Sequence, residues 1–453
     1  SEEDCKWVEE TIAGMTTEEK IGQLFFNMGS SRDEEYLKMT VDKYHIGGIR
    51  YNPATGAEVR EQNRILQENS KIPLIIACNT ENGGNGACTD GTMIGQQTKI
   101  GATRDARYAY ELGRMSNKEA AAIGCNLSFA PVSDILYNWE NPVIGLRTYG
   151  NDVDRVCEMT KAYMDGAHTN EGFCCAAKHF PGDGLDFRDQ HVADSVNDMS
   201  CEEWDASYGK VYQNLIDNGL EAIMAGHIMQ PAYTRHFNPG IKDEDIMPAT
   251  LSPELIEGLL RGKLGFNGMV LTDASHMVGL TCCMKRSEML PHTIAAGVDM
   301  FLFFNEMDED FASMMAGYEN GIITEERLND ALHRILALKA HMGLHKKAKN
   351  EIVPPVEVME QVVGCEEHKA MAREISEKGI TLVKYKDEDV LPMIPSRYKR
   401  IMIVSVSGLS AGVMGTMMAK YMGGGKKSPA ERLRDKLIEK GFDAFIYESP
   451  LDA

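Results

Sequence analysis

Short apolar runs rich in β-branched residues recur along the chain, and each is followed by a polar residue and a longer amphipathic segment. Near-continuous apolar runs separated by helical stretches are typical of a parallel sheet that helices cover. The pattern therefore predicts repeated strand–helix units. The eight runs are 21–26, 46–51, 73–80, 127–132, 174–180, 221–227, 268–274 and 298–303.

The positions of polar residues indicate which kind of parallel sheet this is. Polar side chains stand at the C-terminal ends of the expected strands, and a closed barrel gathers those ends on one face. An open, doubly wound sheet, the alternative, would scatter most of them along an edge. We therefore expect an α/β fold with a (β/α)8 TIM barrel. The polar residues at strand ends are Asn79, Lys178, His179, His227 and Asp273.

The pattern changes after the expected eighth unit, which a helix over 324–344 closes. A basic segment with two prolines, 345–358, is typical of a linker. An expected buried strand over 400–408, a helix capped by Ser428 and a strand over 442–448 then make one βαβ unit. We expect a catalytic barrel over 1–344, a linker over 345–365, and a partial or truncated C-terminal α/β domain over 366–453.

Charge excludes two classes of partner. Lys and Arg number 47 against 68 Asp and Glu, which gives a net charge of −21. A surface this negative repels phosphate backbones and anionic lipid heads, so we expect neither a nucleic acid nor a membrane partner. No apolar run approaches the roughly 20 residues that cross a bilayer. The sequence leaves the oligomeric state open.

The cysteines bear on the compartment. There are 11, an odd number, and the adjacent pairs Cys174–Cys175 and Cys282–Cys283 are poorly placed for two bridges. We expect reduced cysteines, which favours the cytoplasm. The chain begins with Ser1 rather than Met, so secretion after removal of a signal peptide stays open. No CxxC pair occurs, and we expect no metal site.

A polar loop, AKHFPGDGLDFRDQHVAD over 177–194, follows the fifth expected strand. Asp189 stands two residues before His191, close enough for its carboxylate to accept a hydrogen bond from the ring Nδ1–H. That bond would fix the tautomer and leave Nε2 facing outward. A loop this polar on the active face of a barrel is usually functional. The alternative is a solvated acidic loop with an incidental histidine.

Three other residues are candidates from their positions alone. Asp273 ends an apolar strand, where it is either the N-cap of the following segment or a catalytic carboxylate at the barrel mouth. His227 ends the sixth run and is either a core histidine or a sugar contact. Arg147 is either a surface charge or a site residue, since its loop starts from the strand that ends at Pro131.

Four segments are similar, in order, to motifs of a known family. KHFPGDG and the following Asp-x-His resemble KHFPGHG…DSH, and the spacing from Lys178 to His191 matches without a gap. NPVIGLRTYGND, APVSDI and LGFNGMVLTDASHM are similar to NPVIGxRSFGxD, APVxDV and LGFxGVIxSDxxxM. The chain thus resembles glycoside hydrolase family 3, and within it the β-N-acetylglucosaminidase branch, over about residues 16–342.

The resemblance implies a role for each matching residue. Asp273 corresponds to the nucleophile, His191 to the acid/base and Asp189 to its orienting partner. A retaining mechanism needs a carboxylate to form a glycosyl-enzyme and a second group to protonate the leaving oxygen and then deprotonate water. A histidine, with an ordinary pKa of about 6.5, can do both near neutral pH. The other implied residues, which contact sugar hydroxyls or support the pocket, are Lys178, His179, Arg147 and Asp134.

The chain departs from the family in the loop after the third strand. The family's VDQEGGR is CNTENGGN here, over 78–85. Asn79 stands where an Asp would bind the sugar, Asn82 is inserted, and the loop's Arg is absent. Asp183 replaces a histidine of the KHFPGHG turn. Because Asn79 can still donate and accept, we expect it to bind a sugar with altered contacts.

The leading hypothesis is an exo-acting β-N-acetylglucosaminidase that acts on cell-wall or chitin-type oligosaccharides. The alternatives within the family are a β-N-acetylglucosaminide phosphorylase, since a neutral histidine repels phosphate less than a carboxylate does, and a β-glucosidase. A non-catalytic sugar-binding protein is the alternative from another class. The presence of Asp273, Asp189 and His191 together argues against it. Neither a metal nor an organic cofactor is implied.

Overall fold

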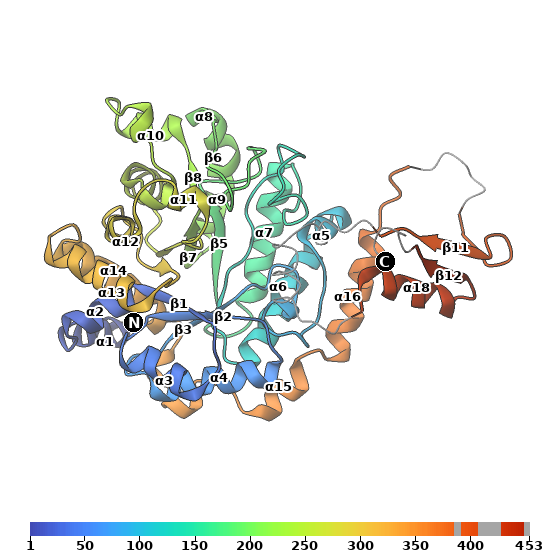
Figure 1. The fold of residues 1–453 in the computed structure, drawn as a ribbon, viewed down its shortest axis with the longest axis horizontal. Coiled ribbons are helices and arrows are strands. Elements are labelled where there is room, and N and C mark those ends of the chain that lie inside the picture. Colours follow the sequence, from blue (N-terminus) through green and yellow to red (C-terminus); the bar gives the residue numbers. More distant parts are fainter. Residues whose placement is uncertain (385–390, 406–426, 448–453) are drawn as a thin grey trace. The chain divides into compact units, whose positions relative to one another are not determined.

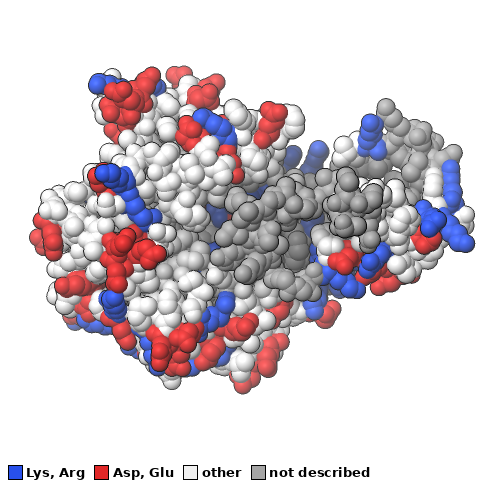
Figure 2. Space-filling view, viewed as in Figure 1, with Lys and Arg blue, Asp and Glu red and all other residues white. Residues whose placement is uncertain are grey.

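The computed structural model describes residues 1–384, 391–405 and 427–447. The chain divides into two compact units, Ser1–Ile380 and Thr381–Ala453. Figure 2 shows acidic and basic side chains interspersed over one face of the first unit. In the ranges that the structure describes, no helix combines the length and the apolar character that a membrane crossing requires.

The first unit is built on a closed barrel of eight parallel strands (Figure 1). The strands pair in the order β10-β1-β2-β3-β4-β5-β7-β9, and a parallel bridge between Leu271 and Met300 joins the last strand to the first. The predicted TIM barrel is thereby confirmed. The strands are β1 (Phe25–Gly29), β2 (Gly48–Tyr51), β3 (Ile75–Cys78), β4 (Leu127–Ser128), β5 (Cys174–Phe180), β7 (Ala222–Ala225), β9 (Met269–Thr272) and β10 (Phe301–Leu302).

The first predicted strand, 21–26, begins too early. Thr16 caps a helix, α2 (Thr17–Gln23), through a reciprocal capping box with Glu19, and the apolar residue Ile21 is buried on that helix. A short apolar run does not distinguish a buried helix from a strand. The strand therefore begins only at Phe25.

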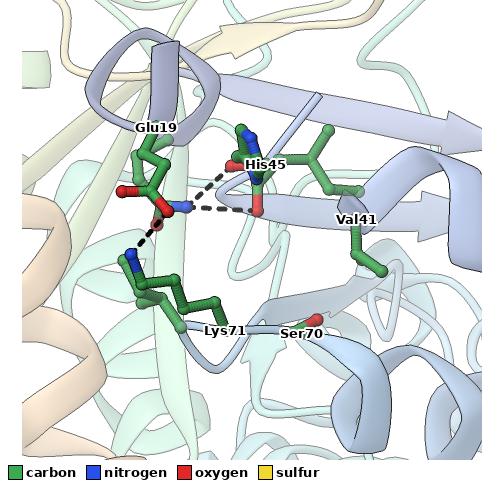
Figure 3. Close-up of a pocket in the computed structure, with 8 residues that line it drawn as sticks. Glu19, Val41, His45, Ser70 and Lys71 are labelled. Carbon is green, nitrogen blue, oxygen red and sulfur yellow. Dashed lines mark hydrogen bonds and ion pairs between the residues drawn. The ribbon is translucent and has the colours of Figure 1, made fainter. Parts of the chain in front are cut away.

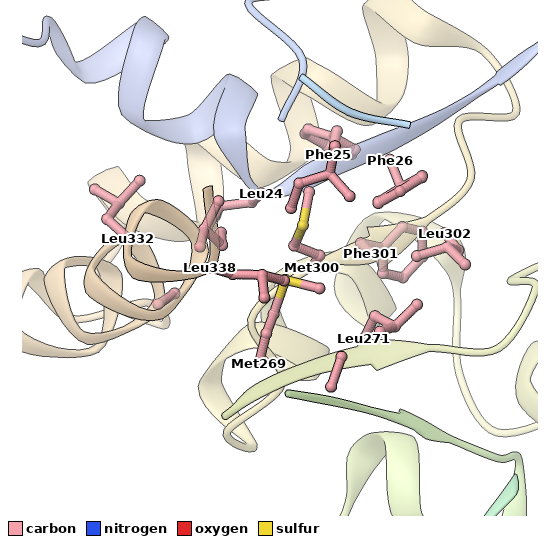
Figure 4. Close-up of a cluster of buried hydrophobic side chains, with 14 of the residues drawn as sticks. Leu24, Phe25, Phe26, Met269, Leu271, Met300, Phe301, Leu302, Leu332 and Leu338 are labelled. Atoms are coloured by element: carbon pink, nitrogen blue, oxygen red, sulfur yellow. The ribbon is translucent and has the colours of Figure 1, made fainter. Parts of the chain in front are cut away.

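Alternation along the strands divides the core into an inner and an outer part. On β3, Ile75 and Ala77 belong to one buried cluster, whereas Ile76 and Cys78 belong to another, so successive side chains face opposite sides of the sheet. Figure 4 shows side chains of α14 (Glu325–His341), a helix that covers the barrel, in the same buried cluster as those of β1, β9 and β10. Each large apolar side chain buried in this way contributes about 1.5–3 kcal/mol relative to exposure.

Helices follow the strands and cover the barrel (Figure 1). Those next to the sheet are α3 (Glu34–Asp42), α4 (Gly56–Asn69), α6 (Ala106–Ala122), α7 (Val153–Ala167), α9 (Lys210–Asp217), the π-type helix Glu254–Lys263, α12 (Arg286–Ala295), α13 (Met307–Glu319) and α14. Others are α1 (Glu2–Ala13), α5 (Gln97–Thr103), α8 (Cys201–Trp204), α10 (Pro231–Phe237), α11 (Val278–Thr281), α15 (Val356–Val362) and α16 (Glu366–Gly379). A short pair, β6 (Ser195–Val196) and β8 (Ile228–Met229), links two loops at the carboxyl ends of the strands.

The first unit extends further than the barrel limit expected at residue 344. The expected linker, 345–365, and helix α16 both lie within it. His368 of α16 is buried, and its Nδ1 lies 2.6 Å from Oε1 of Glu119 on α6. Because a buried carboxylate needs a partner, this contact fixes α16 to the barrel layer.

The second unit contains a parallel pair of strands, β11 (Arg400–Ile403) and β12 (Asp443–Ile446), with α18 (Pro429–Glu439) between them in sequence. Ser428 caps α18 through a capping box, as predicted. The strand expected to be buried over 400–408 is half exposed in its described part, where Met402 is 54% exposed. Residues 406–408 and 448 of the two predicted strands lie outside the described residues.

Candidate active site

His179, near the end of β5, faces the carboxylate of Asp273. Its Nε2 lies 3.8 Å from Asp273 Oδ2, and its Nδ1 lies 2.7 Å from Asp134 Oδ2. Asp134 is fully buried and also accepts the backbone N–H of His179 and of Asp183. Because Asp134 binds the Nδ1 side, it orients the ring so that Nε2 points to Asp273. Asp134 thus acts on the site indirectly, by orienting His179.

Asp273 directly follows β9 and is held in its ionised form. Its Oδ1 accepts a hydrogen bond of 2.7 Å from the N–H of Ala274. Burial alone raises the pKa of this carboxyl, but His179, His227 and the Ala274 N–H together hold the pKa below its ordinary value. A carboxylate that stays charged at neutral pH is suited to nucleophilic attack.

Asp189 and His191 form the hydrogen bond that their spacing predicts. Asp189 Oδ1 lies 2.7 Å from Nδ1 of His191 and also accepts the His191 backbone N–H at 2.8 Å. The His191 side chain is 50% exposed, so the ring reaches solvent. The carbonyl of His191 accepts the N–H of Val278 at 3.1 Å. This bond attaches the Asp189–His191 loop to the segment that follows Asp273.

Lys178 and Arg147 meet at Glu81. Lys178 Nζ lies 2.5 Å from Glu81 Oε1, and Arg147 binds both carboxylate oxygens at 2.9 and 3.0 Å. Burial raises the pKa of Glu81, but the two cations outweigh burial and lower it. Burial lowers the pKa of Lys178 more than Glu81 raises it. The three side chains form a compact charged cluster next to the β5 end.

His227, at the end of β7, uses both ring nitrogens within the protein. Nε2 lies 3.0 Å from the carbonyl of Ala274, and Nδ1 lies 2.8 Å from Oγ1 of Thr250. Burial lowers the pKa of His227, which favours the neutral ring. Of the two readings that the sequence left open for His227, a sugar contact would find no free ring nitrogen in this arrangement. Its geometry is that of a core histidine that supports the loop after Asp273.

Asn79 lies in the loop after β3, in the stretch that carries Glu81. Its backbone N–H donates to the carbonyl of Gly86 at 3.3 Å, which closes the loop on itself. The side-chain Oδ1 is buried and has no hydrogen-bond partner among the residues that the structure describes. A buried amide oxygen without a partner is unfavourable. This oxygen therefore keeps a hydrogen-bonding capacity that the described residues do not use.

Residues 16–338 match the family model described as "Glycosyl hydrolase family 3 N terminal domain". The chain belongs to glycosyl hydrolase family 3. It is 40% identical over 443 residues to a "Beta-N-acetylglucosaminidase/beta-glucosidase" of Cellulomonas fimi, covering 98% of this chain and 76% of that protein. The chain is a glycoside hydrolase on these grounds, as the sequence motifs predicted.

Solved structures of this family have the same architecture. A structure described as "Beta-glucoside phosphorylase BglX bound to 2FGlc" matches with a TM-score of 0.92 and 40% identity, over 99% of this chain and 78% of that one. A family 3 β-N-acetylglucosaminidase from Paenibacillus sp. str. FPU-7 matches with a TM-score of 0.80 and 27% identity, over 96% and 80%. The two differ in the activity named, so family membership alone leaves the substrate open.

Two residues of this family 3 site were not identified from the sequence. One is Glu81, two positions after Asn79. Lys178 and Arg147 are largely buried, and buried cations need a carboxylate as a counter-charge. His276 follows Asp273 in the same motif. Burial and the neighbouring His191 lower the pKa of His276, whereas Asp273 raises it.

Two features at the amino ends of the strands lie apart from this site. Within the described ranges, one group of potential metal ligands, Cys174, Glu221 and His341, brings its atoms within 4.8 Å of one another. Glu221 already pairs with His168 and accepts the Cys175 N–H. A small pocket also opens beside an ion pair of 2.5 Å between Lys71 and Glu19 (Figure 3). Neither feature includes a predicted site residue.

Proposed function

We propose that the chain is a retaining, exo-acting β-N-acetylglucosaminidase that releases terminal β-linked N-acetylhexosamine from cell-wall or chitin-type oligosaccharides. The observation that carries the proposal is the hydrogen-bonded Asp189–His191 pair, on a loop attached to the segment after the ionised Asp273. A carboxylate and a separate proton donor are the two groups that retention requires. The names of the Cellulomonas and Paenibacillus relatives support the sugar.

In the first step, a carboxylate oxygen of Asp273 attacks the anomeric carbon and forms the glycosyl-enzyme bond. The bond from that carbon to the leaving oxygen breaks, and the leaving oxygen takes a proton from Nε2 of His191. Asp189 accepts from Nδ1–H throughout and stabilises the imidazolium form before the transfer. The half-exposed ring suits a leaving group that extends into solvent.

In the second step, His191 is neutral and accepts a proton from water as the water oxygen attacks the anomeric carbon. The bond to Asp273 breaks and the carboxylate regains its charge. The neighbours that lower its pKa make it a good leaving group. Two inversions at one carbon give net retention of configuration.

Sugar hydroxyls would be bound by the polar groups around Asp273. Lys178 and Arg147 use part of their donors on Glu81, and their remaining N–H groups are available to hydroxyl oxygens. Asn79 offers a buried carbonyl oxygen to a hydroxyl donor. His179 lies within 3.8 Å of the attacking carboxylate and so borders the reacting carbon. We assign these four residues to the binding of the terminal sugar.

A second candidate is phosphorolysis, or hydrolysis of β-glucosides. The names of the 40%-identical relatives include both a β-glucosidase and a β-glucoside phosphorylase. After the first step His191 is neutral, whereas a carboxylic acid in the same role would be an anion that repels phosphate. Phosphate is already an anion, so its oxygen can attack the anomeric carbon without a base that removes a proton. Attack by phosphate would release sugar 1-phosphate and restore the Asp273 carboxylate.

A panel of nitrophenyl glycosides tests the proposed sugar. We expect the β-N-acetylglucosaminide to be cleaved faster than the β-glucoside by at least about tenfold, the effect of about 1.4 kcal/mol of differential binding. Equal rates, or a preference for the glucoside, would contradict the proposal. The loop that carries Asn79 and Glu81 would then account for the altered specificity.

The cysteines favour a reducing compartment for this activity. All 11 are free, and residues such as Cys78, Cys174 and Cys175 are buried. Proteins that persist in oxidising compartments commonly use cysteines in bridges. We therefore propose that the enzyme acts in the cytoplasm.

A further inference from the structure

Gln190 separates Asp189 from His191 and is fully buried, although the His191 side chain is 50% exposed. Its Nε2 donates to Asp183 Oδ2 at 3.1 Å, and its Oε1 accepts the backbone N–H of His227 at 2.9 Å. Its carbonyl accepts the N–H of Gly279 at 3.0 Å. One residue therefore joins the loops that follow β5, β7 and β9.

The acceptor of Gln190, Asp183, is itself rigidly held. Asp183 Oδ1 accepts from Asn141 at 2.8 Å and from the N–H of Gly184 at 2.6 Å. The Asp183 N–H donates to Asp134 Oδ1 at 2.8 Å, and Asp134 also orients His179. Hydrogen bonds thus connect Gln190, through Asp183 and Asp134, to the His179 ring that faces Asp273.

The packing around Gln190 leaves the main chain little room. A Cβ built on Gly279 would lie 3.0 Å from the carbonyl oxygen of Gln190 and 3.1 Å from that of His227. Such a contact is tighter than ordinary van der Waals separation. The loop that carries the acid/base pair and the segment after Asp273 are therefore in close backbone contact at this point.

The two partners are also the two positions at which this chain departs from the quoted signature. KHFPGHG…DSH has histidine where this chain has Asp183 and serine where it has Gln190. Here the two replacements bind each other.

We propose that Gln190 is a positioning residue and that, with Asp183, it forms a buried latch that holds His191 at the correct distance from Asp273. The proposal rests on the acid/base role proposed for His191. Asp189 fixes the orientation of the ring, and Gln190 fixes the position of the backbone that carries both. A displacement of about 1 Å in a reacting group can reduce the rate about 100-fold.

A matched pair of variants separates positioning from simple loss of stability. Gln67 is equally buried and also makes two hydrogen bonds, of 2.9 and 3.0 Å, to the backbone of Leu74, but at the amino end of β3. We expect Gln190→Ala and Gln67→Ala to lower the melting temperature similarly. Only Gln190→Ala should reduce kcat on a disaccharide, by about 10–100-fold, with KM nearly unchanged. Equal kcat in the two variants would overturn the proposal.

An exchange of donor and acceptor tests the latch directly. Gln190→Glu places two carboxylates against each other, and Asp183→Asn places two amides there with their donors opposed. The double variant restores a hydrogen bond with the amide at 183 and the carboxylate at 190, and the His227 N–H keeps its acceptor. We expect each single variant to lose activity and the double variant to recover most of it. A double variant no better than the singles would refute the latch.

Two controls keep this test independent of the acid/base assignment. His191→Ala shows how the rate depends on the leaving group when the proton donor is removed; if it shows no such dependence, the proposed function fails. Hydrogen exchange of the backbone over 183–196 reports the latch without any activity. We expect faster exchange there in Gln190→Ala than in Gln67→Ala. Unchanged exchange would overturn the latch even if His191 proves to be the acid/base.

Discussion

The guanidinium of Arg147 binds the Glu81 carboxylate side-on, with Nε 3.0 Å from Oε2 and Nη2 2.9 Å from Oε1. This two-point contact fixes the plane of both groups, which a single contact would not do. Lys178 approaches the same carboxylate from the end of β5. Glu81 therefore determines where two of the proposed sugar-binding cations lie.

Replacing Glu81 with glutamine should destabilise the protein and weaken substrate binding. The variant keeps the shape but leaves Lys178 and Arg147 without a counter-charge in a buried position. Breaking a buried ion pair typically costs about 3–5 kcal/mol. Thermal and urea denaturation, together with KM for a nitrophenyl glycoside, measure the two effects.

The matched control for this substitution is Glu68→Gln. Glu68 pairs with Arg64 on the surface, where the two side chains are 31% and 37% exposed. An exposed pair contributes about 0–1 kcal/mol, so the control should remain close to the parent protein. Equal losses in the two variants would show that the Glu81 cluster has no special role.

The nucleophile and the proton donor should respond differently to the leaving group. Asp273→Asn should abolish activity on every substrate, because the covalent bond cannot form. His191→Ala should lose about 10²–10⁴-fold on a disaccharide and much less on the glycosylation of a nitrophenyl glycoside, since nitrophenolate departs without a proton. Asp189→Asn should fall between them. Steady-state rates on the two substrates give the comparison.

Pre-steady-state kinetics adds a second criterion for His191. Without its base, the glycosyl-enzyme of His191→Ala should break down slowly and accumulate, giving a burst of nitrophenolate. A uniform loss on both substrates without a burst would mean that His191 only binds the sugar. Asp183 and Asp186 in the same loop would then be the next acids to examine.

A phosphate titration distinguishes the two candidate reactions. If the neutral His191 admits anions, millimolar phosphate should divert the glycosyl-enzyme to sugar 1-phosphate in proportion to its concentration. Product analysis by NMR at constant ionic strength separates this from a general salt effect. Only free sugar at every phosphate concentration would exclude phosphorolysis.

Lys339 should make stability depend on pH. It is fully buried on α14, its Nζ lies 2.6 Å from Gln23 Oε1, and burial lowers its pKa from 10.5 to about 7. The unfolded chain therefore binds the proton more tightly. The resulting destabilisation is complete below about pH 7 and disappears as the pH rises towards 10.5.

The substitution Lys339→Met should therefore stabilise the protein most at pH 7 and below. One pKa unit corresponds to about 1.4 kcal/mol, and the lost Gln23 hydrogen bond offsets about 1 kcal/mol, so a gain on the order of 4 kcal/mol is expected. The gain should shrink towards pH 10. Lys369→Met, at a side chain that is 49% exposed, is the control. A gain independent of pH would contradict the assignment.

The strands were predictable because their apolar runs and the polar residues at their ends are local in the sequence. The His191–Asp189 bond was also predictable, since it depends on a spacing of two residues. Glu81 was not, because the need for a carboxylate arises only when Lys178 and Arg147, from separate loops, are buried together. For His227 the sequence left two readings open, and the bonds of its ring nitrogens depend on distant segments.

The contact between His368 and Glu119 also bears on the loop that follows β3, which carries Glu81. Glu119 also accepts both the N–H and the hydroxyl of Thr92, which pairs the loop after β3 with α6. A protein shortened to end at residue 344 would lose His368, Ala372 and Ile375, all buried on α16, and would expose the core residues that they cover. For minimal versions of the enzyme, the boundary therefore belongs after Ile380, since a helix outside the eight repeats acts as a brace for the loop that carries Glu81.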